Sequence, residues 1–322
     1  MRRSRRRVRA VRCLRDLGEF ELIARIARAA GRPPPRSGVI LGIGDDAALL
    51  RPRAGEDVAI SADTYVENVH FRWRSDSPRS VGRRALVANL SDLAAMGARP
   101  LGFTLALAAP AALPVRRADA LVAGMLHEAR AHGCPLVGGN VTRARETHLA
   151  ITAIGCVVRG RALRRGTARP GDRLLVTGTL GGAALERARA ERAGGRVRHV
   201  ATPRLSAGAC LARIPAVSAC IDISDGFDAD LRQLLGEQLH AVVDERRLPQ
   251  AAGFERACAR LGLDARRLVR AGGEDYELLF TLRPSGPRTA LLARRLGLRL
   301  TEVGRVVRGA PTGRTAGGWR HF

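Results

Sequence analysis

The residues of this sequence that could carry chemistry are aspartates that stand beside glycine or serine and between apolar residues. Asp45 and Asp46 follow two glycines in the stretch LGIGDDAALL at 41–50. Carboxylates between apolar flanks are costly to desolvate unless a cation, a strong donor or a proton compensates them. An isolated pair of this kind is also typical of an exposed turn at the end of a strand. Further acidic clusters at 222–225 and 274–277 favour one metal site assembled from separate loops.

Two elements in the first half of the chain are expected to present further oxygen ligands. A strand predicted at 57–62 runs directly into Asp63, and strand ends commonly present binding side chains. The helix predicted at 80–98 places Asp92 on or beside its buried stripe. Because an unpaired carboxylate there would be unfavourable, we expect a metal ion or an arginine next to it.

The second half carries further acidic clusters and a glycine-rich turn, without an internal repeat of the first half. Asp222, Ser224 and Asp225 come just before a predicted helix, where they serve either as an N-terminal cap or as ligands. The glycine-rich turn at 178–182 is a weak candidate for a phosphate cradle, and a packed turn is the preferred interpretation. The remaining pattern predicts helices at 18–30 and 115–132, strands at 39–43, 101–108, 135–137, 148–158 and 173–177, and a turn-rich domain boundary at 161–172.

Composition limits the classes of protein that this chain can belong to. A length of 322 residues suits about two domains of ordinary size. The formal net charge is +25, and all 55 cationic side chains are arginine, which excludes the lysines of a P-loop and of a protein-kinase lobe. This excess of arginine reflects either a compositional bias or a preference for anions such as phosphates. Six scattered cysteines without a Cys-x-x-Cys pair predict reduced thiols and a cytoplasmic location. The most apolar run, at 101–115, is too short and too rich in proline to span a membrane.

Taken in order, the motifs resemble those of the thiamine-monophosphate kinases from about residue 18 to the end of the chain. The matching segments are GEFELIARIA (18–27), LGIGDDAALL (41–50), ISADTYVENVHF (60–71), ALVANLSDLAAMGARP (85–100), LVGGNVTR (136–143), ACIDISDGFDADL (219–231), AGGEDYELLFT (271–281) and GWRHF (318–322). The resemblance implies an aminoimidazole-ribonucleotide-synthetase-like fold, with an N-terminal α/β domain that forms a homodimer and a C-terminal α+β domain. The expected divisions are a disordered arginine-rich arm at 1–17, an ATP- and Mg-binding dimerisation domain at 18–163, and a domain at 164–322 that completes the nucleotide and substrate cleft.

The resemblance also implies an activity, the ATP-dependent phosphorylation of thiamine monophosphate to thiamine diphosphate, with several Mg²⁺ ions holding the ATP. Carried onto this sequence, the implied metal ligands are Asp46 with Asp45 beside it, Ser61, Asp63, Asp92, Asn140, Asp222 and Asp225. The implied ATP contacts are Gly139, Asn140, Arg165 and Ser224. The implied contacts to thiamine phosphate are His70, Glu274 and Trp319.

Phosphoryl transfer asks a protein mainly for positioning and for neutralisation of charge. A phosphate-monoester acceptor is already largely deprotonated near neutral pH, so we expect direct in-line transfer without a general base. His70 is then a substrate contact, and a satisfied loop histidine is the alternative. Trp319 either stacks on the cationic thiamine rings or forms a hydrophobic lid.

Two positions depart from the pattern of the family. Asn140 stands where a carboxylate is usual, which removes one negative charge from a site for a hard cation. Ala62 stands where a threonine is usual, which removes a side-chain oxygen. Two alternatives follow: another ATP-dependent enzyme of the same superfamily, or a degenerate paralogue that binds nucleotide or nucleic acid without kinase activity. The kinase is the preferred interpretation, and neither a membrane nor a nucleic acid is an expected partner.

Overall fold

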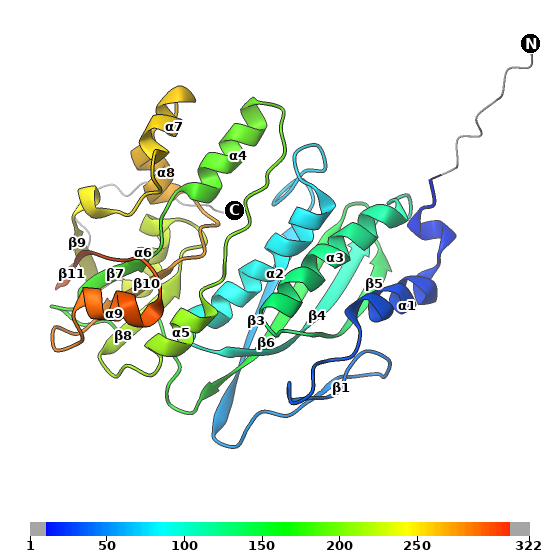
Figure 1. The fold of residues 1–322 in the computed structure, drawn as a ribbon, viewed down its shortest axis with the longest axis horizontal. Helices are drawn as coiled ribbons and strands as arrows, with labels where there is room; N and C mark the ends of the chain where they lie inside the picture. The colour runs from blue at the N-terminus through cyan, green and yellow to red at the C-terminus, as the bar shows by residue number, and fades with distance from the viewer. Residues whose placement is uncertain (1–10, 310–322) are drawn as a thin grey trace, which may run out of the picture.

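The computed structural model describes residues 11–309, and its first half is built on a four-stranded sheet with the order β3-β6-β4-β5. The strands are β3 (Glu56–Val66), β4 (Arg99–Ala109), β5 (Leu136–Arg143) and β6 (His148–Val158). Strand β6 pairs antiparallel with both neighbours, whereas β4 and β5 are parallel and connected through a helix. Figure 1 shows helices α2 (Pro78–Ala95) and α3 (Val115–Ala131) side by side over one face of this sheet.

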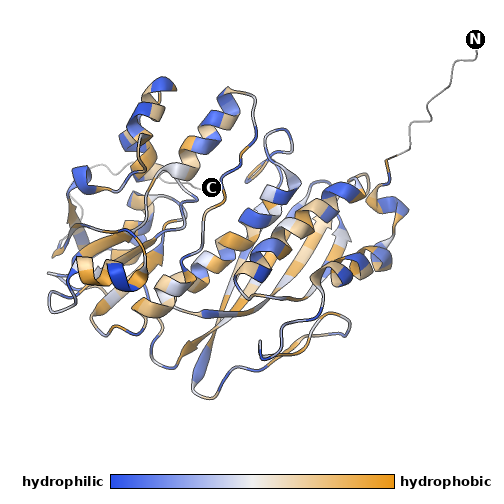
Figure 2. Ribbon diagram, in the orientation of Figure 1, coloured by the Kyte–Doolittle hydropathy of each residue, from blue (hydrophilic) through white to orange (hydrophobic). Residues whose placement is uncertain are grey.

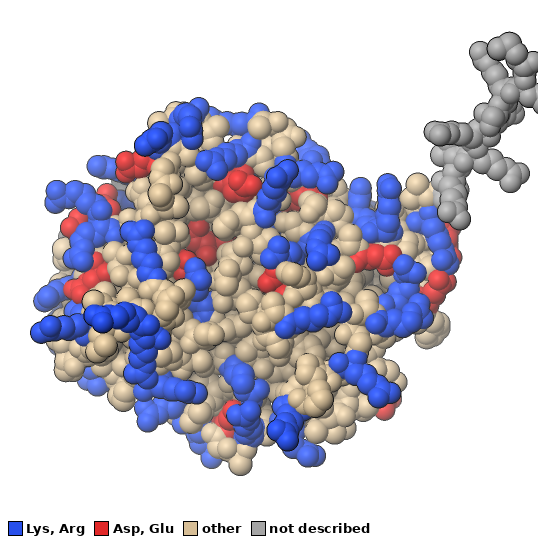
Figure 3. Space-filling view, viewed as in Figure 1, with Lys and Arg blue, Asp and Glu red and all other residues tan. Residues whose placement is uncertain are grey.

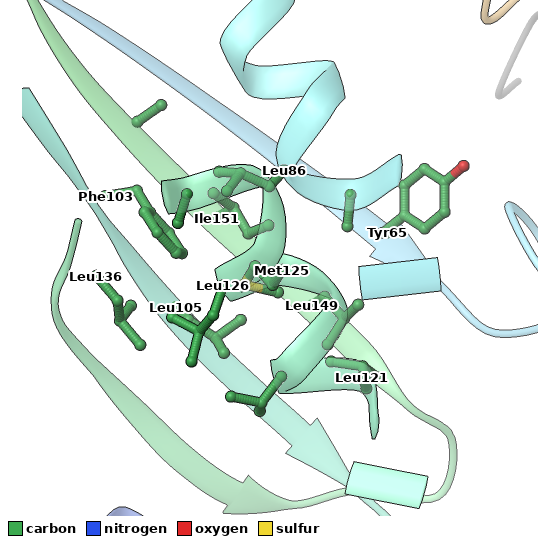
Figure 4. Close-up of a cluster of buried hydrophobic side chains, with 14 of the residues drawn as sticks. Tyr65, Leu86, Phe103, Leu105, Leu121, Met125, Leu126, Leu136, Leu149 and Ile151 are labelled. Atoms are coloured by element: carbon green, nitrogen blue, oxygen red, sulfur yellow. The ribbon is translucent and has the colours of Figure 1, made fainter. Parts of the chain in front are cut away.

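The first hydrophobic core lies between this sheet and the two helices. Large side chains from both layers interdigitate there, among them Phe103, Leu86 and Leu121 (Figure 4). Helices α2 and α3 approach closely, because a Cβ atom at Gly82 would lie 1.9 Å from the Leu121 carbonyl oxygen. The start of α2 is fixed by Ser77, whose side chain accepts a hydrogen bond from the N–H of Ser80.

The second half is built on an antiparallel five-stranded sheet with the order β8-β10-β7-β11-β9. Its strands are β7 (Arg173–Thr177), β8 (Val217–Asp222), β9 (Leu239–Val243), β10 (Leu278–Leu282) and β11 (Leu300–Arg308). Alternate residues serve opposite faces, as a strand requires: Leu279 joins one core and Phe280 the other. Ala94 and Ala95, at the end of α2, pack into the core that contains Phe280, so α2 contributes to the cores of both halves. Figure 2 shows the apolar residues concentrated along the strands of both sheets.

Shorter elements complete the fold. They are 3-10 helix η1 (Leu14–Asp16), α1 (Glu19–Ala30), β1 (Val39–Leu41), β2 (Leu49–Leu50), α4 (Gly182–Arg192), α5 (Leu205–Leu211), α6 (Phe227–Leu235), 3-10 helix η2 (Glu245–Arg247), α7 (Phe254–Arg260), α8 (Ala265–Ala271) and α9 (Thr289–Leu296). The predicted mixed α/β and α+β fold class is confirmed. Three local expectations differ from the structure. The arm expected at 1–17 includes 3-10 helix η1, while its residues 1–10 lie outside the described residues. The strand predicted at 57–62 continues to Val66, so Asp63 lies within β3 and not after its end. The expected loop after residue 137 continues as strand β5 to Arg143.

Candidate active site

A cleft of about 300 Å³ lies between helix α2, strand β3 and the edge of the second sheet. The cleft brings together six of the site residues expected from the sequence: Ser61, Asp92, Arg165, Asp222, Ser224 and Asp225. Ser61 comes from β3, Asp92 from the last turn of α2, and Asp222 from the end of β8. Residues more than 100 positions apart therefore meet at the junction of the two sheets.

Two carboxylates, those of Asp92 and Asp222, dominate the electrostatics of the cleft. The Ser61 hydroxyl donates to Asp92, and the Ser91 hydroxyl donates to Asp222 over 2.7 Å. Burial, followed by repulsion from Asp92, raises the pKa of Asp222 to about 7. Burial also raises the pKa of Asp92, against the opposing effects of the Ser61 hydrogen bond and the Arg165 charge. Two desolvated carboxylates that repel each other create a demand for a cation.

The loop that follows β8 is held from two sides. The carboxylate of Asp230, on helix α6, accepts hydrogen bonds from the backbone N–H groups of Ser224, Asp225 and Gly226. On the other side, the N–H of Glu274 donates to the Ser224 carbonyl over 2.8 Å. Burial raises the pKa of Asp230, and the amide hydrogen bonds act in the opposite direction. The acidic clusters at 222–225 and 274–277 are therefore hydrogen-bonded neighbours.

Glu274 lies at the centre of a second polar group beside this loop. Its carboxylate accepts hydrogen bonds from the Tyr65 hydroxyl and, over 3.2 Å, from Arg187, and it forms an ion pair with Arg84. Although burial acts to raise it, the charges of Arg84 and Arg187 lower the pKa of Glu274 below its ordinary value. The backbone of Glu274 is left-handed, with φ of 64°, a conformation that is uncommon outside glycine and is often retained at functional sites.

His70 joins this second group through its ring and its backbone. The ring stacks on that of Tyr65 at 5.1 Å between centroids, and the His70 carbonyl accepts a 3.5 Å hydrogen bond from Arg187. Its Nδ1 atom accepts from the N–H of Val66 at 3.0 Å. An Nδ1 atom that accepts carries no proton, so Nε2 is the donor nitrogen of this imidazole. The structure thus brings together His70 and Glu274, the two described residues expected to contact the thiamine phosphate.

The glycine-rich turn before α4 is a packed turn, as the sequence analysis preferred. The Asp275 carboxylate accepts from the N–H groups of Gly181 at 2.7 Å and Ala183 at 3.3 Å. These are the donors that would otherwise bind a phosphate at a helix N-terminus. Because Asp275 already occupies them, this turn offers no phosphate cradle.

Four expected site residues lie away from the cleft in a single chain. Asp45 and Asp46 are exposed on the loop between β1 and β2, where the Asp46 N–H donates to Asp45. Asn140 is exposed on β5 opposite Ala106, on the sheet face away from α2. Gly139 is packed on β4, because a Cβ atom there would lie 2.0 Å from the Leu105 carbonyl oxygen. Trp319 lies outside the described residues.

Asp63 lies on β3 between Ser61, which lines the cleft, and Tyr65, which contacts Glu274. It lies on β3 two residues after Ser61, is exposed, and its charge acts on the buried Tyr276 hydroxyl, whose pKa is raised mainly by burial. Among the residues that the structure describes, no three aspartate, glutamate, histidine or cysteine side chains converge into a ready-made metal cage. The aspartate and serine side chains that line the cleft offer hard oxygen donors, however, and Mg²⁺ commonly binds through one or two carboxylates together with phosphates and water. The donor set therefore fits Mg²⁺ held jointly with a phosphate ligand.

Sequence reasoning missed several residues that build the site. Ser91 holds Asp222, Asp230 holds the loop after β8, and Arg84 and Tyr65 hold Glu274. Ser91 and Asp230 each stand within the motifs that carry the resemblance, which was the available signal. Ser91 contacts a residue 131 positions away, and Asp230 contacts the turn that precedes its own helix. The periodicity of a sequence indicates neither kind of contact.

Comparisons with known proteins show the class of protein to which this chain belongs. Residues 44–157 match the family described as AIR synthase related protein, N-terminal domain. The chain is 39% identical over 267 residues to a thiamine-monophosphate kinase from Synechococcus elongatus, covering 77% of this chain and 79% of that protein. A crystal structure of thiamine-monophosphate kinase from Stenotrophomonas maltophilia superposes with a TM-score of 0.78 at 39% identity, covering 91% of this chain and 95% of the other. A structure described as AaThiL complexed with AMPPCP and TMP gives 0.72 at 27% identity, covering 96% and 98%. The chain belongs to the thiamine-monophosphate kinase family.

On the face that Figure 3 shows, arginines are spread over both halves of the molecule, with acidic residues interspersed. Within residues 11–309, no helix combines the length and apolar character needed to cross a membrane.

Proposed function

We propose that this chain transfers the terminal phosphate of ATP to thiamine monophosphate. The observation that carries this proposal is the cleft that Asp92, Asp222 and Arg165 line together, with Glu274 hydrogen-bonded to the loop after β8. Carboxylates that need a cation suit a Mg·nucleotide, and the neighbouring Glu274 and His70 suit an acceptor. The comparisons give no support to the alternative of an inert paralogue.

Asp92 and Asp222 would hold Mg²⁺, which when bound would supply positive charge to neutralise the phosphates of ATP. Arg165 contributes a fixed positive charge on the same side of the cleft, since its side chain is held by Gln233. Glu274 is kept ionised by two arginines, and the neutral His70 keeps a donor at Nε2 for the acceptor. No described side chain is required as a base, because the acceptor phosphate is already deprotonated.

Asp46 and Asn140 remain proposed ligands, and a second copy of the chain is the proposed means of bringing them to the cleft. Asn140 is three strands from β3, about 14 Å at the usual strand spacing, and lies on the opposite face of the sheet from Ser61. That outer face exposes apolar side chains, including Ile60 at 68% and Val158 at 57%. Exposed apolar patches commonly mark interfaces, so we propose a homodimer through this face.

Complementation tests this arrangement. If Asp46 of one copy serves the Asp222 of its partner, mixing Asp46→Asn chains with Asp222→Asn chains restores activity that neither variant has. Ile60→Arg should dissociate the dimer in light scattering, since it places a charge in the apolar face. Restoration of the carboxylate by Asn140→Asp should lower the Mg²⁺ concentration needed for half-maximal rate. Mixtures without activity would show that each site is made from one copy.

The choice of acceptor tests the proposed function itself. Purified chain is incubated with Mg²⁺ and ATP, and with either thiamine monophosphate or unphosphorylated thiamine. The proposal predicts thiamine diphosphate and ADP in equal amounts from the monophosphate, and no product from thiamine. A cytoplasmic location is proposed as well, in keeping with the six free cysteines.

A further inference from the structure

The loop after β8 directs its backbone N–H groups at a buried carboxylate of the protein itself. Three successive N–H groups, those of Ser224, Asp225 and Gly226, point at one carboxylate oxygen, Oδ2 of Asp230, at 3.0, 3.0 and 3.1 Å. Successive N–H groups in a turn form a concavity that binds anions. Here the concavity is filled from within the protein, since Asp230 is 1% exposed and lies at the wall of the cleft.

The filled concavity determines what the loop can offer to a ligand. Because its N–H groups are directed at Asp230, the polar groups left to the loop are mainly side-chain oxygens, and Asp222, Ser224 and Asp225 all line the cleft. The opposite side of the loop is fixed too, because the Ser224 carbonyl accepts from the Glu274 N–H and the Ile223 carbonyl accepts from the Tyr276 N–H, both at 2.8 Å. The loop therefore has one orientation, in which it attracts cations and not anions.

We propose that Asp230 is a positioning residue that makes this loop specific for metal-bound nucleotide. It does so by withdrawing the three N–H groups from the phosphates and by fixing the backbone of Ser224 and Asp225, whose side chains then remain available to Mg²⁺. The inference rests on the proposed function for the identity of the nucleotide. Loss of Asp230 should weaken binding that depends on Mg²⁺ while leaving metal-free nucleotide binding unchanged or stronger, because the N–H groups become available to phosphate.

Calorimetric titration of the full chain with AMPPCP, in Mg²⁺ and separately in EDTA, tests this proposal. Asp230→Ala is expected to lower the affinity for Mg·AMPPCP by about tenfold or more, as for other residues that orient metal ligands. Asp230→Asn keeps one acceptor oxygen and should recover part of that loss. The matched control is Asp228→Ala, which removes another buried carboxylate of α6, one that is paired with Arg270 instead of with the N–H groups of the loop.

The results separate positioning from a general structural role. A destabilised helix α6 would weaken binding in both solutions and in both alanine variants, and that result would overturn the proposal. So would an Mg·AMPPCP affinity of Asp230→Ala within twofold of the wild type. If Asp230→Ala does not fold, the comparison of Asp230→Asn with Asp228→Asn decides the question, since only the former should weaken Mg·AMPPCP binding. Wild-type chain that binds Mg·AMPPCP but forms no thiamine diphosphate would refute the proposed function and leave the role of Asp230 testable.

Discussion

The buried guanidinium of Arg84 allows a stability prediction to be worked directly from the structure. Its side chain is 5% exposed and forms an ion pair with Asp76, whose side chain is 0% exposed, and with Glu274. Removing one partner of a buried ion pair typically costs 3–5 kcal/mol, because the remaining charge has no partner. Asp76 would keep two hydrogen bonds, from the Arg72 N–H and the Ser75 hydroxyl. The expected loss for Arg84→Met is therefore at the lower end, about 3 kcal/mol of unfolding free energy.

Urea denaturation followed by circular dichroism measures this loss. The control is Arg159→Met, which removes an exposed arginine paired with Asp57 at 3.5 Å and should change the unfolding free energy by about 0.5 kcal/mol or less. In the Arg84→Met background, Asp76→Asn should recover part of the loss, since it removes the unpaired charge. An Arg84→Met variant within about 1 kcal/mol of the wild type would refute the reasoning, as would a second substitution that recovers nothing.

Two further predictions concern packing and pH. Gly82→Ala should lower the unfolding free energy by about 1–3 kcal/mol, because the added methyl meets the Leu121 carbonyl of α3. The control is Gly182→Ala, where no atom lies closer than 4.0 Å to the added methyl. Equal urea midpoints for the two variants would count against the close approach of α2 and α3. Burial raises the pKa of Asp275 to about 7, above an unfolded value near 3.9, so the native state binds the proton more tightly. The stability contributed by this group is present below about pH 4 and is lost as the pH rises through about 7. Asp275→Asn should remove this part of the pH dependence of unfolding, and an unchanged profile would show that Asp275 titrates normally.

The sequence predicted the long elements well and the contacts between loops poorly. Helices α2 and α3 and strand β6 have enough residues for their periodicity to be read, and the stripe on α2 correctly placed Asp92 at the edge of the buried face. Helices α5, α7 and α8 have seven residues each, about two turns, which is too short for a periodic signal.

The residue types of the site could be predicted from the sequence, whereas the contacts between those residues could not. Recurrence of aspartates beside glycine and serine indicated a shared site, and six expected residues do meet in one cleft. That the Glu274 N–H bonds to the Ser224 carbonyl could not be read from the sequence, because it depends on how β8 and β10 pair. The separation of Asn140 from Ser61 likewise follows from strand order and from the face on which each residue lies.

The central claim is that the paired carboxylates of the cleft hold the Mg·ATP from which phosphate passes to thiamine monophosphate. Its most direct test is the initial rate of thiamine diphosphate formation, measured against Mg²⁺ concentration for the wild type and for Asp222→Asn. We expect a wild-type rate that saturates with Mg²⁺ and an Asp222→Asn rate lower by about two or more orders of magnitude, because charge stabilisation is removed. A wild-type chain that forms no thiamine diphosphate at millimolar Mg²⁺, or an Asp222→Asn variant with an unchanged rate and Mg²⁺ dependence, would contradict it.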